Sequence, residues 1–196
     1  MRQPTAFTVL AAVLLLGGCG AGPRDAASTT PPPVPAPAVT TAPTRTGTAF
    51  NPTDIAWLQL TAAMTERLLP VLDLVPARTT DPVWRRTATE VATTRRADLD
   101  RARRLLADAA APTTNPHEGH DMPGMVTAQE LTALRAASGK PFLRLLAGHL
   151  RAHLAQSVRI AEAEQQSGVQ PATLALAAAV VRTGTDELAR LDHLPG

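Results

Sequence analysis

Residues 117–125 of the chain read HEGHDMPGM and place two histidines and two methionines within nine residues. Imidazole binds copper in either oxidation state and thioether sulfur prefers Cu(I), whereas magnesium and calcium take oxygen ligands. The spacing therefore predicts a copper-binding loop with four candidate ligands: His117, His120, Met122 and Met125. A segment with this much glycine and proline is also typical of an ordinary connection between helices. Composition alone leaves the two interpretations open.

A second set of candidate ligands lies in longer apolar segments. His149 and His153 are four residues apart, which places both side chains on one face of a helix, as two ligands of one metal ion require. Met64, in an earlier helical segment, would add a thioether to this pair. Neutral histidines and single methionines are also ordinary core residues. These three residues are therefore predicted as secondary ligands or as part of the core.

Four long helices and one short helix are predicted to position these residues. Three long helices begin with an N-cap residue followed by proline: Asn51-Pro52, Asp81-Pro82 and Gln170-Pro171. Thr127 and Glu130 form a capping box that begins the short helix. Residues 138–141 interrupt that helix, and the third long helix is predicted to begin at Phe142.

The helical region repeats itself, because a shift of 89 residues without a gap aligns many identical residues. The aligned pairs include Pro52 with Pro141, Pro82 with Pro171, Val91 with Val180 and Leu99 with Leu188. Two similar helical hairpins close naturally into an antiparallel four-helix bundle. The predicted fold is all-α: such a bundle over residues 50–196, with a short extra helix after the central loop. Residues 112–126 are expected to connect the halves and to cap one end of the bundle, and the shift aligns Met64 with His153.

The start of the chain predicts export. Residues 1–19 combine Arg2, a short apolar run and the sequence Leu16-Gly17-Gly18-Cys19, which is typical of a bacterial lipoprotein signal peptide. Cys19 is the only cysteine and is predicted to become the mature N-terminus, carrying fatty acyl chains such as palmitate. Residues 20–49 are rich in proline, alanine and threonine and are predicted to form a disordered tether. The membrane is thus the predicted partner, through a lipid anchor on the outer face of the cell membrane.

Composition argues against several classes of protein. The net charge is +2 and the chain has five aromatic residues and no tyrosine, so stacking platforms for nucleic acid are missing. No nucleophile–base motif, phosphate-binding glycine loop or paired catalytic carboxylates stand out, so no enzymatic activity is predicted. The Glu-x-x-His motifs of di-iron bundles are also missing. A binding protein or a structural bundle remains.

The motifs of residues 50–194 resemble those of the domain of unknown function 305 family. The resemblance rests on the order of five features: Met122-Pro123-Gly124-Met125 before a capped helix, Ala136-Ala137-Ser138-Gly139, Phe142, His153 and Ala161-Glu162. It implies a ferritin-like bundle and an exported bacterial protein, and several members of the family are associated with copper. Copper is therefore the cofactor that the resemblance implies.

The chain departs from the family pattern inside the bundle. The resemblance implies a His-His pair in each of two helices, where this chain has Met64-Thr65 and His153-Leu154. It also implies two glutamines, which are replaced here by Arg95 and Gly184. The acids that follow these two positions remain, as Asp98 and Glu187.

Arg95 lies on the apolar side of its predicted helix, together with Asp98. An unpaired buried charge strongly destabilises a fold, so Arg95 is predicted to form a core ion pair with Asp98 or Glu187. This ion pair, in place of an interior metal site, is the preferred interpretation of the core.

Two functional hypotheses follow. The first is a cell-envelope lipoprotein that binds copper, or silver, for buffering or sequestration through the His/Met loop. The second is a bundle without metal, structural or protein-interacting, whose ancestral metal site has degenerated.

Overall fold

The computed structural model describes residues 49–194, which form five helices. They are α1 (Pro52–Arg78), α2 (Pro82–Asp108), α3 (Ala128–Ala136), α4 (Gly139–Ser167) and α5 (Pro171–Leu191). The predicted signal peptide, Cys19 and all of the predicted tether except its last residue lie outside the described residues. None of the described helices is long and apolar enough to cross a membrane.

The helix starts follow the local capping chemistry. The Asn51 side chain accepts a hydrogen bond from Asp54 N at 2.8 Å, and the Asp54 carboxylate accepts one from Asn51 N at 2.7 Å. Thr127 and Glu130 form the same reciprocal arrangement at α3. Each cap satisfies backbone N–H groups that have no partner within the first turn of a helix. Asp81 and Gln170 accept from backbone N–H groups in the same way at α2 and α5.

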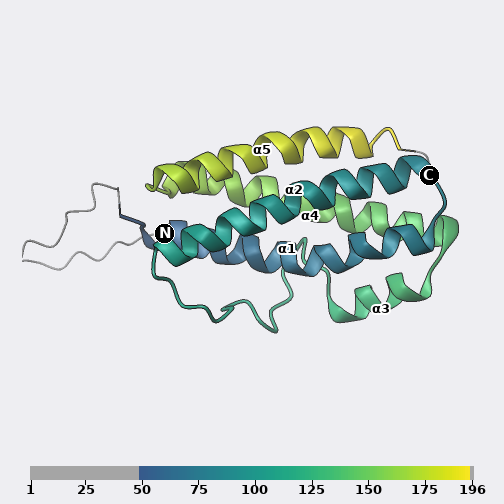
Figure 1. Cartoon of the computed structure of the whole chain (residues 1–196), viewed down its shortest axis with the longest axis horizontal. Helices are drawn as coiled ribbons and strands as arrows, with labels where there is room; N and C mark the ends of the chain where they lie inside the picture. Colours follow the sequence, from purple (N-terminus) through teal and green to yellow (C-terminus); the bar gives the residue numbers. More distant parts are fainter. Residues whose placement is uncertain (1–48, 195–196) are drawn as a thin grey trace, which may run out of the picture. The chain divides into compact units, whose positions relative to one another are not determined.

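The four long helices form the predicted antiparallel bundle, and each runs opposite to its neighbours (Figure 1). Helices α1 and α2 form one hairpin and α4 and α5 the other, and the two hairpins pack together through α1 with α4 and α2 with α5. The 89-residue repeat holds at two boundaries. Helices α1 and α4 end at Arg78 and Ser167, and helices α2 and α5 begin at Pro82 and Pro171.

The core consists of the apolar stripes of the long helices. The largest buried cluster surrounds Phe142, Leu146 and Leu150 of α4 with residues of α1, α2 and α3, and a smaller one contains Trp57. Burial of this apolar surface is the main force that holds the hairpins together. The burial of these stripes also determines which faces of α1 and α4 remain free to contact the segment that connects the two hairpins.

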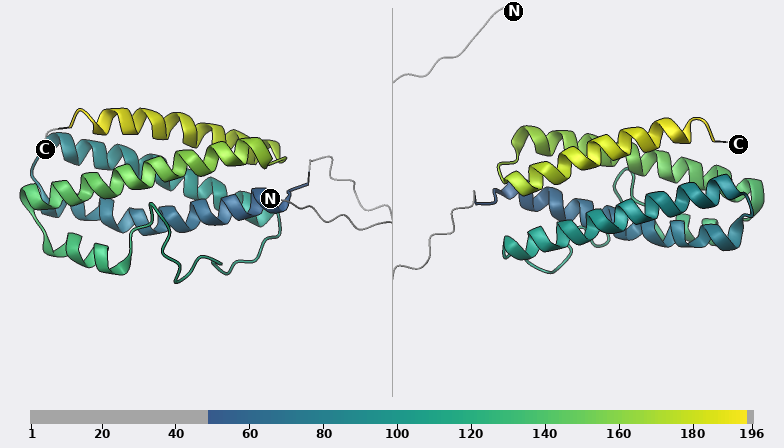
Figure 2. Two further views of the ribbon diagram at one scale, coloured as in Figure 1. Left: turned by 180° about the vertical axis from the view of Figure 1, so that it is seen from behind. Right: turned by 45° about the horizontal axis from the view of Figure 1, so that its top comes forward.

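Two details differ from the sequence-based expectations. Helix α4 begins at Gly139 rather than at Phe142, because proline is tolerated in the first turn of a helix and Pro141 does not delay the start. The connection between α2 and α3 does not cap the end of the bundle. It runs along the outside of α1 and bends inward just before α3 (Figures 1 and 2). The contacts that bend it inward are those of the candidate site.

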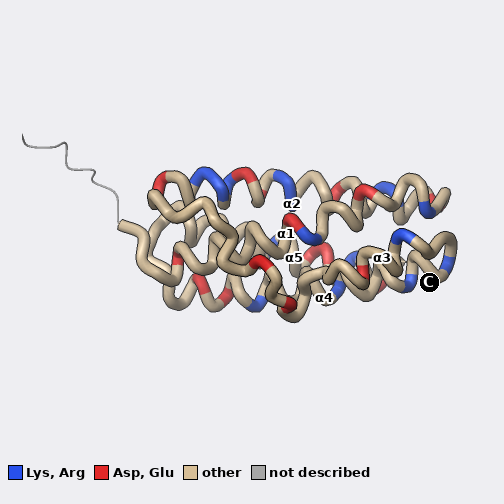
Figure 3. Tube along the Cα trace, turned by 90° about the horizontal axis from the view of Figure 1, so that it is seen from below, with Lys and Arg blue, Asp and Glu red and all other residues tan. Residues whose placement is uncertain are grey.

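Basic and acidic residues are interspersed along the helices of the bundle (Figure 3). On α2, Arg96 pairs with Asp73 at 2.5 Å and Arg103 pairs with Glu66 at 2.9 Å. Both pairs are well exposed, and exposed pairs contribute little to stability. Arg96 and Arg103 thus belong to a solvated, salt-bridged face of α2.

Candidate functional site

The methionine end of the connection is a tight turn that inserts into the side of the bundle. Met125 N donates a hydrogen bond to Met122 O at 3.0 Å and closes the turn. Met125 is only 5 % exposed and packs with Ala63 and Met64 of α1, while Met122 is partly buried against the same cluster. The three predicted thioether ligands therefore belong to one apolar cluster.

Gly124 allows this turn to lie directly on α4. Its φ of +82° falls in the left-handed region, which side chains other than that of glycine rarely adopt. A Cβ at this position would lie 2.7 Å from Gln156 Cβ and 2.9 Å from Ala152 O, both on α4. Glycine is thus required here twice, for the backbone conformation and for the close approach.

His153 holds the turn from inside the bundle. Its Nδ1 lies 3.3 Å from Gly124 O, and because a carbonyl oxygen only accepts, Nδ1 carries the proton. Nε2 has no hydrogen-bond partner among the described residues. Burial and the nearby charge of Arg95 lower the pKa of His153 to about 3, although the contact with Gly124 opposes the shift. His153 is therefore a neutral donor that positions the Met122–Met125 turn.

A cavity of about 310 Å³ opens beside the turn. Met122, Met125 and His149 line it, together with the carboxylates of Asp121 and Glu130. The structure thus brings together one imidazole and two thioethers from the predicted ligand set. His149 is half-buried and comes from α4, whereas both methionines come from the turn.

The two carboxylates at the cavity are already engaged. Glu130 accepts from Thr127 N, a hydrogen bond that lowers the pKa of Glu130, and the charge of the nearby His149 lowers it further. Asp121 forms an ion pair with Arg67 of α1 at 3.0 Å, which holds the connection against the bundle. These oxygens partly neutralise positive charge at the cavity, but their existing partners make them poor primary ligands.

His117 and His120 lie elsewhere on the connection and do not line this cavity. His120 is exposed and donates its backbone N–H to His117 O, while His117 is half-buried. Burial and the neighbouring charge of His120 lower the pKa of His117. Of the nine-residue motif, Asp121 and the methionine end line this cavity, and the two histidines do not.

Inside the bundle, Arg95 forms the ion pair expected from the sequence. Its side chain is 2 % exposed, and Nη2 lies 3.0 Å from Glu187 Oε2 and 3.1 Å from Thr183 Oγ1. Asp98 is a more distant partner, with Oδ2 3.5 Å from Nη1. Burial raises the pKa of Asp98 and of Glu187, and the charge of Arg95 opposes this shift.

This guanidinium also acts on His153, which it helps to keep neutral. A metal cation on His153 Nε2 would be repelled by the buried positive charge of Arg95. Within residues 49–194, no three side chains of histidine, aspartate, glutamate or cysteine are grouped so that they could hold a metal ion.

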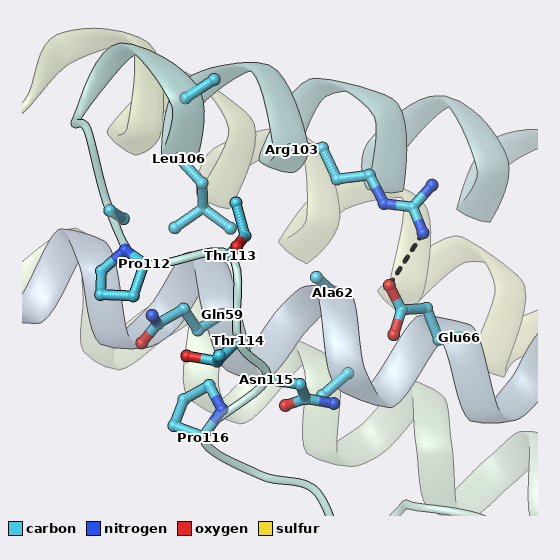
Figure 4. A pocket seen from close by; sticks show the side chains of 13 residues that line it. Gln59, Ala62, Glu66, Arg103, Leu106, Pro112, Thr113, Thr114, Asn115 and Pro116 are labelled. Carbon is cyan, nitrogen blue, oxygen red and sulfur yellow. Dashed lines mark hydrogen bonds and ion pairs between the residues drawn. The ribbon is translucent and has the colours of Figure 1, made fainter.

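A second cavity, of about 260 Å³, lies between α1, α2 and residues 111–116 (Figure 4). The Arg103–Glu66 ion pair closes one side of it, and most of its surface is apolar. No histidine or methionine lines it. It therefore does not offer the ligands of the first cavity.

The role of three residues at the site was not expected from the sequence. Asp121 lies inside the motif but is not one of its candidate ligands, the sequence indicates only a capping role for Glu130, and Gly124 stands out only as part of the MPGM sequence. The spacing of Glu130 and His149 in the sequence does not predict that they line the same cavity, because their proximity depends on how α3 packs beside α4.

The fold and the site define a class of protein: an all-α bundle of two similar hairpins, with a methionine-containing turn inserted into its flank. The family described as Domain of unknown function (DUF305) matches residues 54–194, so the chain belongs to this family. The comparison with curated proteins finds no match.

Two solved structures share the fold. A DUF305 protein from Streptomyces coelicolor, described as a candidate secreted protein, has 21% sequence identity and a TM-score of 0.65. The similarity covers 71% of this chain and 89% of that chain. A DUF305 fragment from Deinococcus radiodurans has 17% identity and a TM-score of 0.68, over 74% of this chain and 97% of that one. At these identities the likeness concerns the fold alone.

Proposed function

We propose that this protein is an exported, lipid-anchored binding protein that takes up Cu(I) at the cavity beside the methionine turn. Met122 and Met125 would supply soft thioether sulfur and His149 an imidazole nitrogen, a combination that suits Cu(I). The observation that carries the proposal is that these three side chains, from two separate segments, line one cavity of about 310 Å³. Silver(I), which also prefers soft ligands, is the alternative cargo.

The arrangement suits reversible binding rather than catalysis. The ligands lie at the edge of the bundle, on a turn that is anchored by the burial of Met125 and by the contact between His153 and Gly124. Met64, behind Met125, provides a third thioether that a shift of the turn would bring into play. Sequestration or buffering of copper needs no more than this. Export is supported by the signal sequence of residues 1–19 and by the description of the Streptomyces relative as a candidate secreted protein.

The test is an anaerobic Cu(I) titration of the mature protein from Cys19 onward, purified in detergent without a histidine tag. The variant Met122→Leu/Met125→Leu removes both sulfurs but keeps the apolar volume, so the turn should stay in place. We expect it to weaken Cu(I) binding by about 100-fold or more, since even outer-shell changes at metal sites cost 10–100-fold. His149→Gln is expected to weaken binding in the same way.

The matched control is His117→Gln/His120→Gln, which removes the two histidines that do not line the cavity. Its affinity should stay within about threefold of the wild type, a difference of less than about 1 kcal/mol. Loss of binding in this control, with full binding by the Leu/Leu variant, would move the site to the histidine end of the connection.

A second candidate is a structural or protein-interacting bundle without metal. The observation that favours it is the Arg95–Glu187 ion pair, which places a guanidinium and its carboxylate partner in the interior of the bundle. The two proposals differ in one measurement, because a ligand of the native state raises stability by mass action. No increase in the melting temperature with excess Cu(I) or Ag(I) would favour the structural role.

A further inference from the structure

Two acidic side chains meet at the end of the bundle where α1 begins, away from the copper cavity. Asp54 of α1 is 0 % exposed and Glu164 of α4 is 1 % exposed. Both carboxyl groups lie beside Gly168: a Cβ at residue 168 would overlap Glu164 Oε1 and would lie 2.9 Å from Asp54 Oδ1. A side chain at residue 168 would displace the pair.

Asp54 is surrounded by donors. Its Oδ2 accepts from Asn51 N at 2.7 Å, and its Oδ1 accepts from Val169 N and Gln170 N at 3.2 Å each. Burial alone would raise the pKa of Asp54, but these hydrogen bonds, together with one from Glu164, hold it below its usual value. Asp54 is therefore the ionised member of the pair.

Glu164 has the opposite surroundings, since neither of its carboxyl oxygens receives a hydrogen bond from the described residues. A second carboxylate in this place would be buried, unpartnered and next to a negative charge. A proton on Glu164 removes all three difficulties, because the protonated carboxyl donates to Asp54. Burial, this hydrogen bond and the charge of Asp54 raise the pKa of Glu164 to about 8. Within the described part of the chain, no charged side chain other than Asp54 shifts it.

The pair joins three helices. Asp54 belongs to the first turn of α1, Glu164 to the last turn of α4, and the N–H groups of Val169 and Gln170 to the turn that leads into α5. The Asn51 side chain adds a hydrogen bond from Nδ2 to Ser167 O at 2.8 Å. We propose that Asp54 and Glu164 form a proton-operated clasp, which fastens the start of α1 to the α4–α5 turn when Glu164 is protonated and releases it when Glu164 ionises.

The direction of the pH effect follows from the raised pKa. The folded protein holds the Glu164 proton more tightly than the unfolded chain, so this contribution to stability is complete below the usual value of 4.5 and is lost as the pH rises to about 8. His153 has a lowered pKa, and its contribution changes only below its usual value of 6.5. Between pH 6.5 and 8, therefore, the contribution of Glu164 to stability changes and that of His153 does not.

The test compares the wild type with Glu164→Gln, whose amide donates to Asp54 at every pH. From pH 6.5 to 8 the ratio of the folding constant of E164Q to that of the wild type should rise about 15-fold, because the slope for one proton is tenfold per pH unit well below the pKa of Glu164 and falls to half of that at about pH 8. Urea unfolding of the full-length mature protein provides both constants. The matched control is E162Q on the exposed side of the same helix, for which the ratio should stay constant.

Hydrogen exchange locates the effect. The protection factors of the Val169 and Gln170 amides should fall in the wild type as the pH rises through 8 and should stay constant in E164Q. Asp54→Asn, which removes the charge facing Glu164 but leaves its burial, should reduce the pH dependence without any change at residue 164. Three results would overturn the clasp. The ratio of the folding constants could stay constant with pH, or E164Q could lose as much amide protection as the wild type. Added Ca²⁺ could also stabilise the wild type but not E164Q. The last result would mean that a cation, and not a proton, bridges the carboxylates.

Discussion

The substitution Gly124→Ala tests whether the methionine turn must contact α4 for copper binding. An alanine at a φ of +82° costs about 1–2 kcal/mol in backbone strain. The new Cβ would also stand 2.7 Å from Gln156 Cβ and 2.9 Å from Ala152 O, distances that real Cβ atoms essentially never show. Ala152 O belongs to the helix backbone and cannot move aside, so we expect the turn to leave the bundle.

The cost of this movement is bounded by what anchors the turn. Exposure of a Met125-sized side chain costs about 1.5–3 kcal/mol, and loss of the contact between His153 and Gly124 about 1 kcal/mol. The overlap should therefore lower the stability by about 2–4 kcal/mol and the melting temperature by roughly 5–15 °C. If only the anchored turn binds copper, the Cu(I) affinity should fall by about 30-fold or more, the equivalent of 2 kcal/mol.

Gly119→Ala is the matched control, since Gly119 has a φ of +76° but nothing within 4 Å of an added Cβ. It introduces similar backbone strain without the steric overlap, so we expect a loss of about 1 kcal/mol and an unchanged Cu(I) affinity. Calorimetry and competition with a chromophoric Cu(I) chelator measure the two quantities. Equal effects of the two variants on copper affinity would refute the reasoning, because they would show that the contact with α4 is irrelevant.

Further predictions concern the core, the pH dependence and the anchor. Glu187→Gln should lower the free energy of unfolding by about 3–5 kcal/mol, since it leaves Arg95 buried without its nearest carboxylate. Urea titrations measure this change. A loss below 1 kcal/mol would contradict a stabilising role of the Arg95–Glu187 ion pair. His153→Asn should keep the hydrogen bond to Gly124 O and most of the copper affinity, whereas His153→Ala should lose both. Below pH 6.5 His153 becomes protonated in the unfolded chain, whereas in the folded protein it stays neutral down to about pH 3. The ratio of the folding constant of the wild type to that of His153→Asn should therefore fall about tenfold per pH unit as the pH decreases. Cys19→Ser should move the protein from the membrane fraction to the soluble one; retention on membranes would contradict lipid anchoring.

The fold could be predicted from the sequence because its signals are local or repeated. Each cap acts within four residues, so Asn51, Thr127 and Gln170 mark their helix starts without reference to the rest of the chain. The 89-residue shift then relates the two hairpins, which is enough for a bundle. The class of fold needed no knowledge of any long-range contact.

The site depended on information that the sequence does not carry. The nine-residue motif predicted one ligand cluster, whereas the cavity beside the turn is lined by Met122 and by His149 of α4 but not by His120. The inward bend of the connection results from the fit of Gly124 on α4 and the pairing of Arg67 with Asp121, both of which are contacts between distant segments. Glu164 was likewise unremarkable in the sequence, since only its position opposite Asp54 makes it unusual.

The hydrogen bonds of Asn51 also determine how a force applied to the N-terminal part of the chain would be transmitted to the bundle. The chain that precedes residue 49 joins the bundle at this point, so tension applied through it acts on Phe50, which packs against the core, and on Asn51. The hydrogen bonds of Asn51, to Asp54 on its own helix and to Ser167 at the end of α4, distribute that pull over two helices. A protein held to a surface by its N-terminus would thus resist peeling of α1 at the first turn, and its resistance would depend on the proton held by Glu164.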